Sequence, residues 1–173
     1  TPTSMWLTVK DATTKNIQID PISSLYSIDF SFYGKGPKGT IPLNSIITSL
    51  YYNNMLYSLL RINEQGKGSI LLPKGYFVYS IDKEGYNLIV NKQIYVDATA
   101  SAFNDTLTQK TYSVQFNVKT STGAYDGVSV LLNGYTPLLT NEQGIAIFNE
   151  IGYEKNLAYT IEKSGFIGAN GYI

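Results

Sequence analysis

The sequence predicts an all-β protein that contains two copies of one small module. Three observations support this prediction: blocks of sequence recur in the same order, short segments alternate polar and apolar residues, and strand and turn residues dominate the composition. The chain has 173 residues, of which 15 are Tyr, 15 are Gly and only 15% are charged. That length suits two modules of roughly 80 residues each.

Three blocks of sequence recur along the chain. They are Tyr26–Phe32 with Tyr112–Val118, Asn63–Gly66 with the identical Asn141–Gly144, and Tyr79–Tyr86 with Tyr159–Phe166. The matched blocks are offset by 86, 78 and 80 residues, so the first copy carries about eight extra residues between its first and second blocks, within 34–61. We expect these residues to extend a loop or hairpin on a shared scaffold.

The first block alternates polar and apolar residues in both copies, which predicts a half-buried strand. In the second copy, Thr120–Gly123 predicts a turn and Val128–Leu132 the next strand. Asn133–Gly134 predicts a hairpin, because both residues tolerate a positive φ. The Asn-Glu-Gln-Gly blocks predict a turn that Gly closes in the left-handed region.

Further strands are expected after these turns. The segments are Gly68–Leu72 and Ile145–Phe148, then Tyr76–Ile81 and Leu157–Ile161, and in the first copy Lys92–Val96. The second copy ends at Gly171–Ile173 and is expected to lack the strand that Ile94–Val96 supplies in the first. No amphipathic helix is predicted, and residues 46–60 form the one ambiguous segment.

We therefore expect three parts: residues 1–23, a first sandwich module with its linker at 24–110, and a second module at 111–173. Met5–Val9 and Asn16–Ile19 would be closing strands of a preceding module, or strands added to the first sandwich. We interpret the chain as a segment of a longer array, in which the second module is cut short or is completed by a strand from a partner.

The composition argues against several classes of function. The 13 basic and 13 acidic residues cancel, which disfavours nucleic acid as a partner. The chain has no His and no Cys, so it lacks the commonest general base and the commonest metal ligands. No apolar run approaches the roughly 18 residues of a membrane span. We expect no enzyme activity, no cofactor, no metal and no membrane insertion.

The carboxylates show no convergent spacing. We interpret Asp82, Glu84, Asp126 and Glu142 as solvated turn residues. Four other Asp residues lie near presumed module junctions, where calcium binds in some β-sandwich arrays; they are Asp11, Asp20, Asp97 and Asp105. No calcium-ligand motif surrounds them. The sequence assigns no catalytic residue.

The order of strands and turns, together with Thr140, Gly144, Ala146, Phe148 and Tyr159–Phe166, resembles carboxypeptidase regulatory-like (transthyretin-like) domains. It is also similar to the Cna protein B-type repeats of bacterial surface proteins. This resemblance implies tandem Ig-like or prealbumin-like Greek-key β-sandwiches, used as spacers, stalks and display platforms. Some Cna-type repeats carry a Lys–Asn isopeptide cross-link. Lys119 and Asn170 are the candidates here, but no motif marks them, so we do not assign the cross-link.

One aromatic segment is the candidate binding site: Tyr51, Tyr52, Asn53 and Tyr57. On a hairpin, these residues could stack on a sugar or anchor a protein partner. The alternative is that Tyr51 and Tyr57 cover a sandwich edge while Asn53 and Asn54 form its turn.

The expected function is that of a structural or adhesive β-sandwich repeat, located outside the cell, on a bacterial surface or on a phage virion. The expected partners are proteins, bound by strand exchange or homo-oligomeric assembly. The alternatives are a carbohydrate-binding module that uses residues 51–57 and accessory domains of a larger secreted hydrolase.

Overall fold

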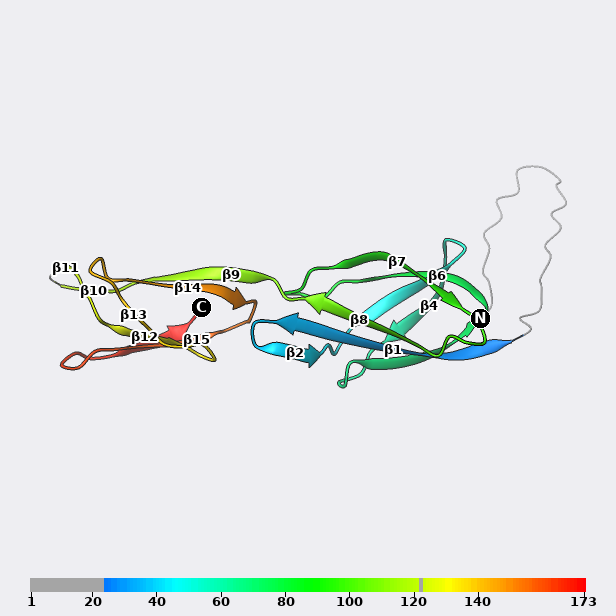
Figure 1. Ribbon diagram of the computed structural model, residues 1–173, viewed down its shortest axis with the longest axis horizontal. Coiled ribbons are helices and arrows are strands. Elements are labelled where there is room, and N and C mark those ends of the chain that lie inside the picture. Colours follow the sequence, from blue (N-terminus) through cyan, green and yellow to red (C-terminus); the bar gives the residue numbers. More distant parts are fainter. Residues whose placement is uncertain (1–23, 122) are drawn as a thin grey trace, which may run out of the picture. The chain divides into compact units, whose positions relative to one another are not determined.

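The computed structural model describes residues 24–121 and 123–173, and every regular element in this part of the chain is a strand (Figure 1). The all-β prediction is therefore confirmed. In chain order the strands are β1 (Leu25–Gly36), β2 (Gly39–Pro42), β3 (Ile47–Tyr52), β4 (Met55–Arg61), β5 (Lys67–Pro73), β6 (Gly75–Ile81), β7 (Ile89–Val96), β8 (Ala102–Thr108), β9 (Thr111–Asn117), β10 (Lys119–Thr120), β11 (Gly123–Ala124), β12 (Ser129–Leu132), β13 (Leu138–Leu139), β14 (Ile145–Gly152), β15 (Ala158–Glu162) and β16 (Ala169–Tyr172).

The described residues form two compact units. Unit 1 contains residues 24–31, 44–81 and 89–104, and unit 2 contains residues 32–43, 82–88, 105–121 and 123–173. Below, residues 24–110 are called the first repeat and residues 111–173 the second repeat, after the sequence blocks that they share. The arrangement as two tandem modules with these boundaries stays a prediction. The strands predicted within residues 1–23 lie outside the described residues.

Unit 1 contains an antiparallel sheet of order β4-β3-β6-β7, and β1 pairs with β5 in antiparallel register. Alternate residues of β1 point inward, because successive side chains of a strand face opposite sides. The Phe30 ring meets the Tyr79 ring of β6 edge-on, with 5.7 Å between centroids. Both side chains are almost fully buried, so they join the two layers of this unit's core.

The last strand of the first repeat, β8, pairs with β1. The amide of Asp29 donates to the Ser101 carbonyl at 3.0 Å, and the amide of Gln109 donates to the Lys35 carbonyl at 2.8 Å. Both partners advance along the chain in the same direction, so β8 runs parallel to β1. Inward-facing residues of β8 add to the core, since Leu107 is 1% exposed and the Phe103 ring lies 5.7 Å from that of Phe30.

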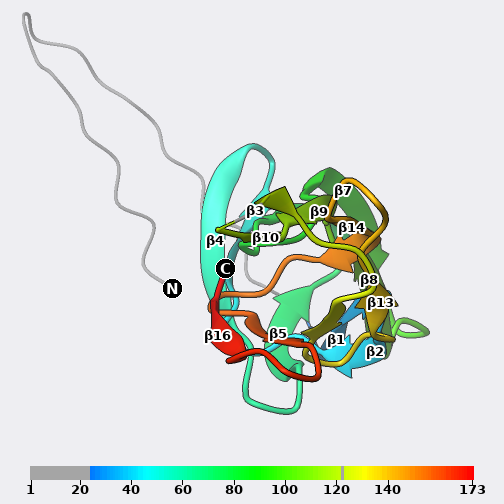
Figure 2. The same cartoon turned by 90° about the vertical axis from the view of Figure 1, so that its left-hand side faces the viewer.

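In the second repeat, which lies wholly in unit 2, a sheet of order β13-β12-β15-β16 packs against the pair β14-β9. Figure 1 shows these two layers, and the turned view in Figure 2 shows β9 beside β14. The Phe116 ring of β9 contacts Phe148 and Tyr159, with centroids 5.9 and 5.2 Å away. The buried cluster between the layers is Val130, Leu132, Ala146, Phe148, Ile151 and Leu157.

The recurring Asn-Glu-Gln-Gly blocks form the same turn twice. The side-chain oxygen of Asn63 accepts from the amides of Gln65 and Lys67 at 3.0 and 2.9 Å. The side-chain oxygen of Asn141 accepts from Gln143 and Ile145 at the same two distances. Each turn closes on a glycine at positive φ, 74° at Gly66 and 72° at Gly144, as the sequence predicts.

The end of the second repeat differs from the expectation. β16 pairs with β15, and Leu157 and Ile173 exchange two backbone hydrogen bonds of 3.0 Å, just as Phe77 pairs with Ile94 in the first repeat. The prediction that the second repeat lacks this strand is therefore wrong. Gly171 interrupts the apolar alternation of this strand, which hid it in the sequence. Within the described residues, the strand without a counterpart is β8.

Candidate functional site

The predicted aromatic site lies on the β3–β4 hairpin of unit 1. Its turn residues Asn53 and Asn54 have φ values of 49° and 60°, which is the left-handed pair that a type I′ turn requires. The ambiguous segment 46–60 is therefore a hairpin, as the turn alternative predicted. Tyr51 is 42% exposed and faces outward.

Tyr52 and Tyr57 face the other way. Both are half-buried, and their rings lie 5.0 and 5.4 Å from that of Phe77, which is fully buried. Burial raises the pKa of the Tyr57 phenol above its ordinary value. Tyr51 therefore points to a different side of the sheet from Tyr52, and the four predicted residues do not form one continuous surface.

The outward face of this sheet is apolar and aromatic. Register places Leu56 beside Tyr51, Tyr51 beside Val78, and Tyr76 beside Tyr95. The rings of Tyr76 and Tyr95 lie 4.7 Å apart, and these side chains are 59% and 40% exposed. The sequence highlighted Tyr51 alone in this set, because cross-strand neighbours cannot be read before the register is known.

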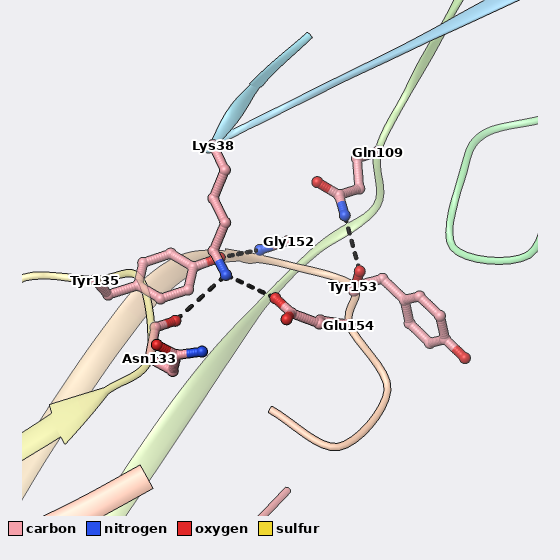
Figure 3. A network of polar contacts seen from close by, with 7 residues as sticks. All are labelled: Lys38, Gln109, Asn133, Tyr135, Gly152, Tyr153 and Glu154. Atoms are coloured by element: carbon pink, nitrogen blue, oxygen red, sulfur yellow. Dashed lines mark hydrogen bonds and ion pairs between the residues drawn. The ribbon is translucent and has the colours of Figure 1, made fainter. Parts of the chain in front are cut away.

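A polar network surrounds Lys38 in the turn between β1 and β2, within unit 2 (Figure 3). The Lys38 ammonium donates to Glu154 at 2.7 Å and to the Asn133 carbonyl at 3.3 Å. It also stands 4.9 Å from the centroid of the Tyr135 ring. The Tyr135 hydroxyl in turn accepts from the Gly152 amide at 3.0 Å. One cation therefore links three segments of the chain.

Gln109 extends this network along the connection between β8 and β9. Its side-chain amide donates to the Tyr153 carbonyl at 2.8 Å. Gly36 and Gly152 leave room for it, because a Cβ at either position would stand 1.9 or 2.5 Å from the Gln109 side-chain oxygen. A cavity of about 320 Å³ lies here; its lining includes Gly34, Tyr86, Gln109 and Tyr153.

Glu84 forms the second part of the polar cluster in unit 2. Tyr153 donates its phenolic hydrogen to Glu84 at 2.5 Å, and the Lys155 ammonium lies 2.7 Å from the other carboxylate oxygen. The hydrogen bond from Lys155, then that from Tyr153, lowers the pKa of Glu84 below its ordinary value. Glu84 in turn raises the pKa values of Tyr153 and Lys155. A general-acid carboxyl needs a raised pKa, so this arrangement favours a fixed ion pair over proton transfer.

A groove of about 280 Å³ lies at the end of β9 in unit 2. Its lining includes Val118, Tyr125, Ile161, Lys163 and Phe166. The rings of Tyr125 and Phe166 meet at 4.9 Å, and Lys163 donates to the Gly127 carbonyl at 2.8 Å. The groove therefore has an apolar wall, and the Lys163 ammonium beside it already donates to a backbone carbonyl.

In a chain without His and Cys, the carboxylates are the main candidates for metal binding. Residues 24–121 and 123–173 hold no group of three or more Asp or Glu side chains that could bind a metal ion. Asp97 accepts from the amide and hydroxyl of Thr99 at 2.8 and 2.6 Å, which orders the turn after β7. Lys119 and Asn170, the candidates for a cross-link, are both exposed. Over the same residues, no helix has the length and apolar character that a membrane crossing needs.

Comparison with known proteins gives structural matches only. No family model matches this chain, and no curated protein matches it. Among solved structures, the Bacillus anthracis TIE protein is similar with a TM-score of 0.60 and 15% identity over 87% of this chain. The chain spans 31% of the length of that protein. This likeness supports the β-sandwich fold.

Two other solved structures match more weakly, but the match covers most of each of those proteins. The shaft pilin SpaA from Lactobacillus rhamnosus GG matches with a TM-score of 0.42 and 12% identity, over 86% of this chain and 94% of that one. A DUF3823 family protein from Bacteroides ovatus matches with a TM-score of 0.37 and 12% identity, over 80% and 89% of the two chains.

Proposed function

We propose that this chain is a non-enzymatic structural segment of an extracellular protein, displayed on a bacterial surface or on a virion. One observation carries the proposal: its polar side chains tie strands and turns to one another. Lys38 links three segments, Asn63 and Asn141 each order a turn, and the buried Thr140 hydroxyl donates to the Tyr125 carbonyl at 2.7 Å. These contacts maintain the shape of the chain, which is the role of a structural segment.

Two further findings support this proposal. The fold is similar to the Bacillus anthracis TIE protein over 87% of this chain. The strand and turn motifs of the second repeat resemble Cna B-type and transthyretin-like modules, which serve as spacers and display platforms. The outward face around Tyr51 gives such a platform an apolar surface suited to adhesion.

The location can be tested with an antibody raised against the 173-residue chain. Immunogold labelling of intact source cells, and of any particles that they release, should place label on the outer surface. Label on cells supports a bacterial surface protein, and label on particles supports a virion protein. Label confined to the cytosol of sectioned cells would overturn the proposal.

A second candidate function is carbohydrate binding by the outward aromatic face of unit 1. The observation that favours it is the shared orientation of Tyr51, Tyr76 and Tyr95, whose exposed rings could stack on sugars. On a glycan array, the Tyr51→Ala, Tyr76→Ala double variant should lose binding, and Tyr112→Ala, which removes an exposed ring in unit 2, should keep it. Equal glycan binding by both variants would exclude this face as the carbohydrate-binding site.

The third alternative, an accessory role beside a catalytic domain, depends on sequence outside these 173 residues. Recovering the full reading frame tests it directly. A catalytic domain in the same frame would support an accessory role, and further β-sandwich repeats would support the structural role.

A further inference from the structure

The chain contains the dipeptide Asn-Gly twice, at Asn133–Gly134 and at Asn170–Gly171. In such a dipeptide the amide nitrogen of glycine can attack the side-chain carbonyl carbon of asparagine, because glycine has no side chain to hinder the approach. The nitrogen must first lose its proton. The reactivity of each site therefore depends on how the fold treats that one amide.

The second dipeptide lies within strand β16, where its glycine amide is bonded in the sheet. Register pairs Gly171 with Tyr159, two positions from the pair Ile173 and Leu157, whose backbones exchange two hydrogen bonds of 3.0 Å. Hydrogen-bonded pairs alternate along an antiparallel ladder, so Gly171 donates its amide to the Tyr159 carbonyl. This hydrogen bond must break before the nitrogen can react.

The first dipeptide lies in the turn after β12. The Tyr135 amide donates to the Leu132 carbonyl at 2.9 Å, and Gly134 has a φ of 80°, as the third residue of a type II turn requires. Asn133 and Gly134 are both exposed. Among the described residues, neither the Gly134 amide nor the Asn133 side chain has a hydrogen-bond partner. Solvent can therefore reach both reacting groups.

A cation lies beside this turn (Figure 3). The Lys38 ammonium, which pairs with Glu154, also donates to the backbone carbonyl of Asn133 at 3.3 Å. The Lys38 side chain lies against Gly134, since a Cβ there would stand 2.8 Å from both its Cε and its Nζ. The fold therefore places a positive charge on the carbonyl of the Asn133–Gly134 peptide bond.

The carbonyl that Lys38 contacts belongs to the same peptide group as the reacting nitrogen. When the Gly134 amide loses its proton, the negative charge spreads to the Asn133 carbonyl oxygen, because the two atoms share one delocalised system. A donor already aimed at that oxygen stabilises the charge as it develops. An ammonium donor does so more strongly than a neutral donor. Lys38 therefore favours formation of the reactive nitrogen.

We propose that Asn133 is a site of spontaneous deamidation that Lys38 promotes. Hydroxide or water takes the Gly134 amide proton, and the nitrogen forms a bond to Cγ of Asn133. The bond from Cγ to the side-chain nitrogen breaks, and this nitrogen takes a proton from solvent and leaves as ammonia. Water then opens the succinimide ring at either carbonyl carbon, which yields aspartate or isoaspartate. Overall, one asparagine and one water become one aspartate, or its isomer, and one ammonia.

This modification goes beyond the proposed function and changes the network around Lys38. Both products add one negative charge to the turn, beside the Lys38 ammonium. Isoaspartate also lengthens the backbone by one carbon atom before Gly134. The Asn133 amide donates to the Ala158 carbonyl of β15 at 2.9 Å, so the longer backbone should disturb the turn where it joins the sheet.

The site can be tested by incubating the purified 173-residue chain at mildly alkaline pH. Peptide mapping with mass spectrometry follows both dipeptides, and chromatography separates isoaspartate from aspartate. In the native chain, Asn133 should convert about tenfold faster than Asn170 or more, because the ladder bond of Gly171 must first open. In urea, where neither turn nor ladder persists, the two sites should convert at similar rates.

Two variants separate the role of the Lys38 ammonium from that of its ion pair. Lys38→Met keeps a long side chain but removes the ammonium. It should slow the conversion of native Asn133 about tenfold, less than the loss of a donor costs in a buried site, because this contact is exposed. Glu154→Gln is the matched control, because it removes the ion pair and leaves the ammonium. Its Asn133 should convert at least as fast as that of the wild type.

The rate at Asn170 should be the same in the wild type and in both variants, and unchanged circular dichroism would show that the variants fold. Two results would overturn the inference. One is a native chain in which Asn133 converts no faster than Asn170. The other is a Lys38→Met variant whose Asn133 converts at the rate of the wild type or of Glu154→Gln.

Discussion

β1 and β9 share a sequence pattern but differ in how deeply they are buried. The inward residues of β1 are fully covered, whereas those of β9 are half-exposed, although both strands alternate in the same way and pair with a strand that follows the same turn. The difference follows from β8, which covers one edge and supplies Phe103 and Leu107. The alternation of polar and apolar residues therefore indicates which side chains face inward. The neighbouring strand in the sheet determines how deeply those side chains are buried.

The largest expected effect compares Phe30 with its counterpart Phe116. Phe30→Ala removes a fully buried ring and should cost about 3–5 kcal/mol of unfolding free energy. Phe116→Ala should cost roughly half as much, because its ring is already partly in contact with water. Urea unfolding of the two variants measures both losses. Equal losses would show that the covering strand does not set the difference between β1 and β9.

A smaller effect should be the same in both repeats. Asn63→Ala and Asn141→Ala each remove a side-chain oxygen that accepts two backbone amides in the same turn geometry. Each should lower the unfolding free energy by about 1 kcal/mol. Chemical denaturation gives the two values. A loss of stability in only one repeat would show that the two turns differ. The turns would then contribute to the difference in burial between β1 and β9, which would contradict its assignment to β8 alone.

The smallest expected effect is the pH dependence of the Glu84 cluster. The pKa of Glu84 is lowered in the folded chain, so its stabilising contribution is present above the ordinary carboxyl pKa and is lost as pH falls through the lowered value. The difference in melting temperature between wild type and Glu84→Gln should therefore be constant near neutral pH and shrink in acid.

The matched control is Ser164→Ala, because Ser164 occupies the position of Glu84 in the second repeat. Its melting temperature should differ from that of the wild type by the same amount at every pH. A Glu84→Gln difference that persists unchanged in acid would contradict the assignment of this contribution to the carboxylate. These side chains are exposed, so the whole effect should be small.

Local chemistry made much of the fold predictable. Asn63–Gly66 and Asn133–Gly134 are turns because their residues favour the required backbone angles, and the alternation in β1 and β9 reports the inward face directly. β16 was missed because Gly171 interrupts its short apolar pattern. Residues 102–108, which form β8, were expected to belong to the linker, because the polar Asp105 takes the inward position between Phe103 and Leu107. Local signals were therefore sufficient for the turns and for most strands, and insufficient for β8 and β16.

The candidate sites depended on information that the sequence does not carry locally. Tyr51 and Tyr52 are adjacent in sequence and so face opposite sides of β3, which separates two of the predicted binding residues. The contact between Lys38 and Glu154 joins residues 116 positions apart, and no local pattern marks it. The glycines that accommodate Gln109 give a signal only after the approach of its side chain is known.

The parallel pairing of β1 with β8 has a mechanical consequence. The first repeat begins with β1 and ends with β8, so tension applied to its two ends pulls these neighbouring strands lengthwise past each other. Their evenly spaced hydrogen bonds then share the force simultaneously and do not open one after another. A tether built in this way resists stretching most strongly along its own axis.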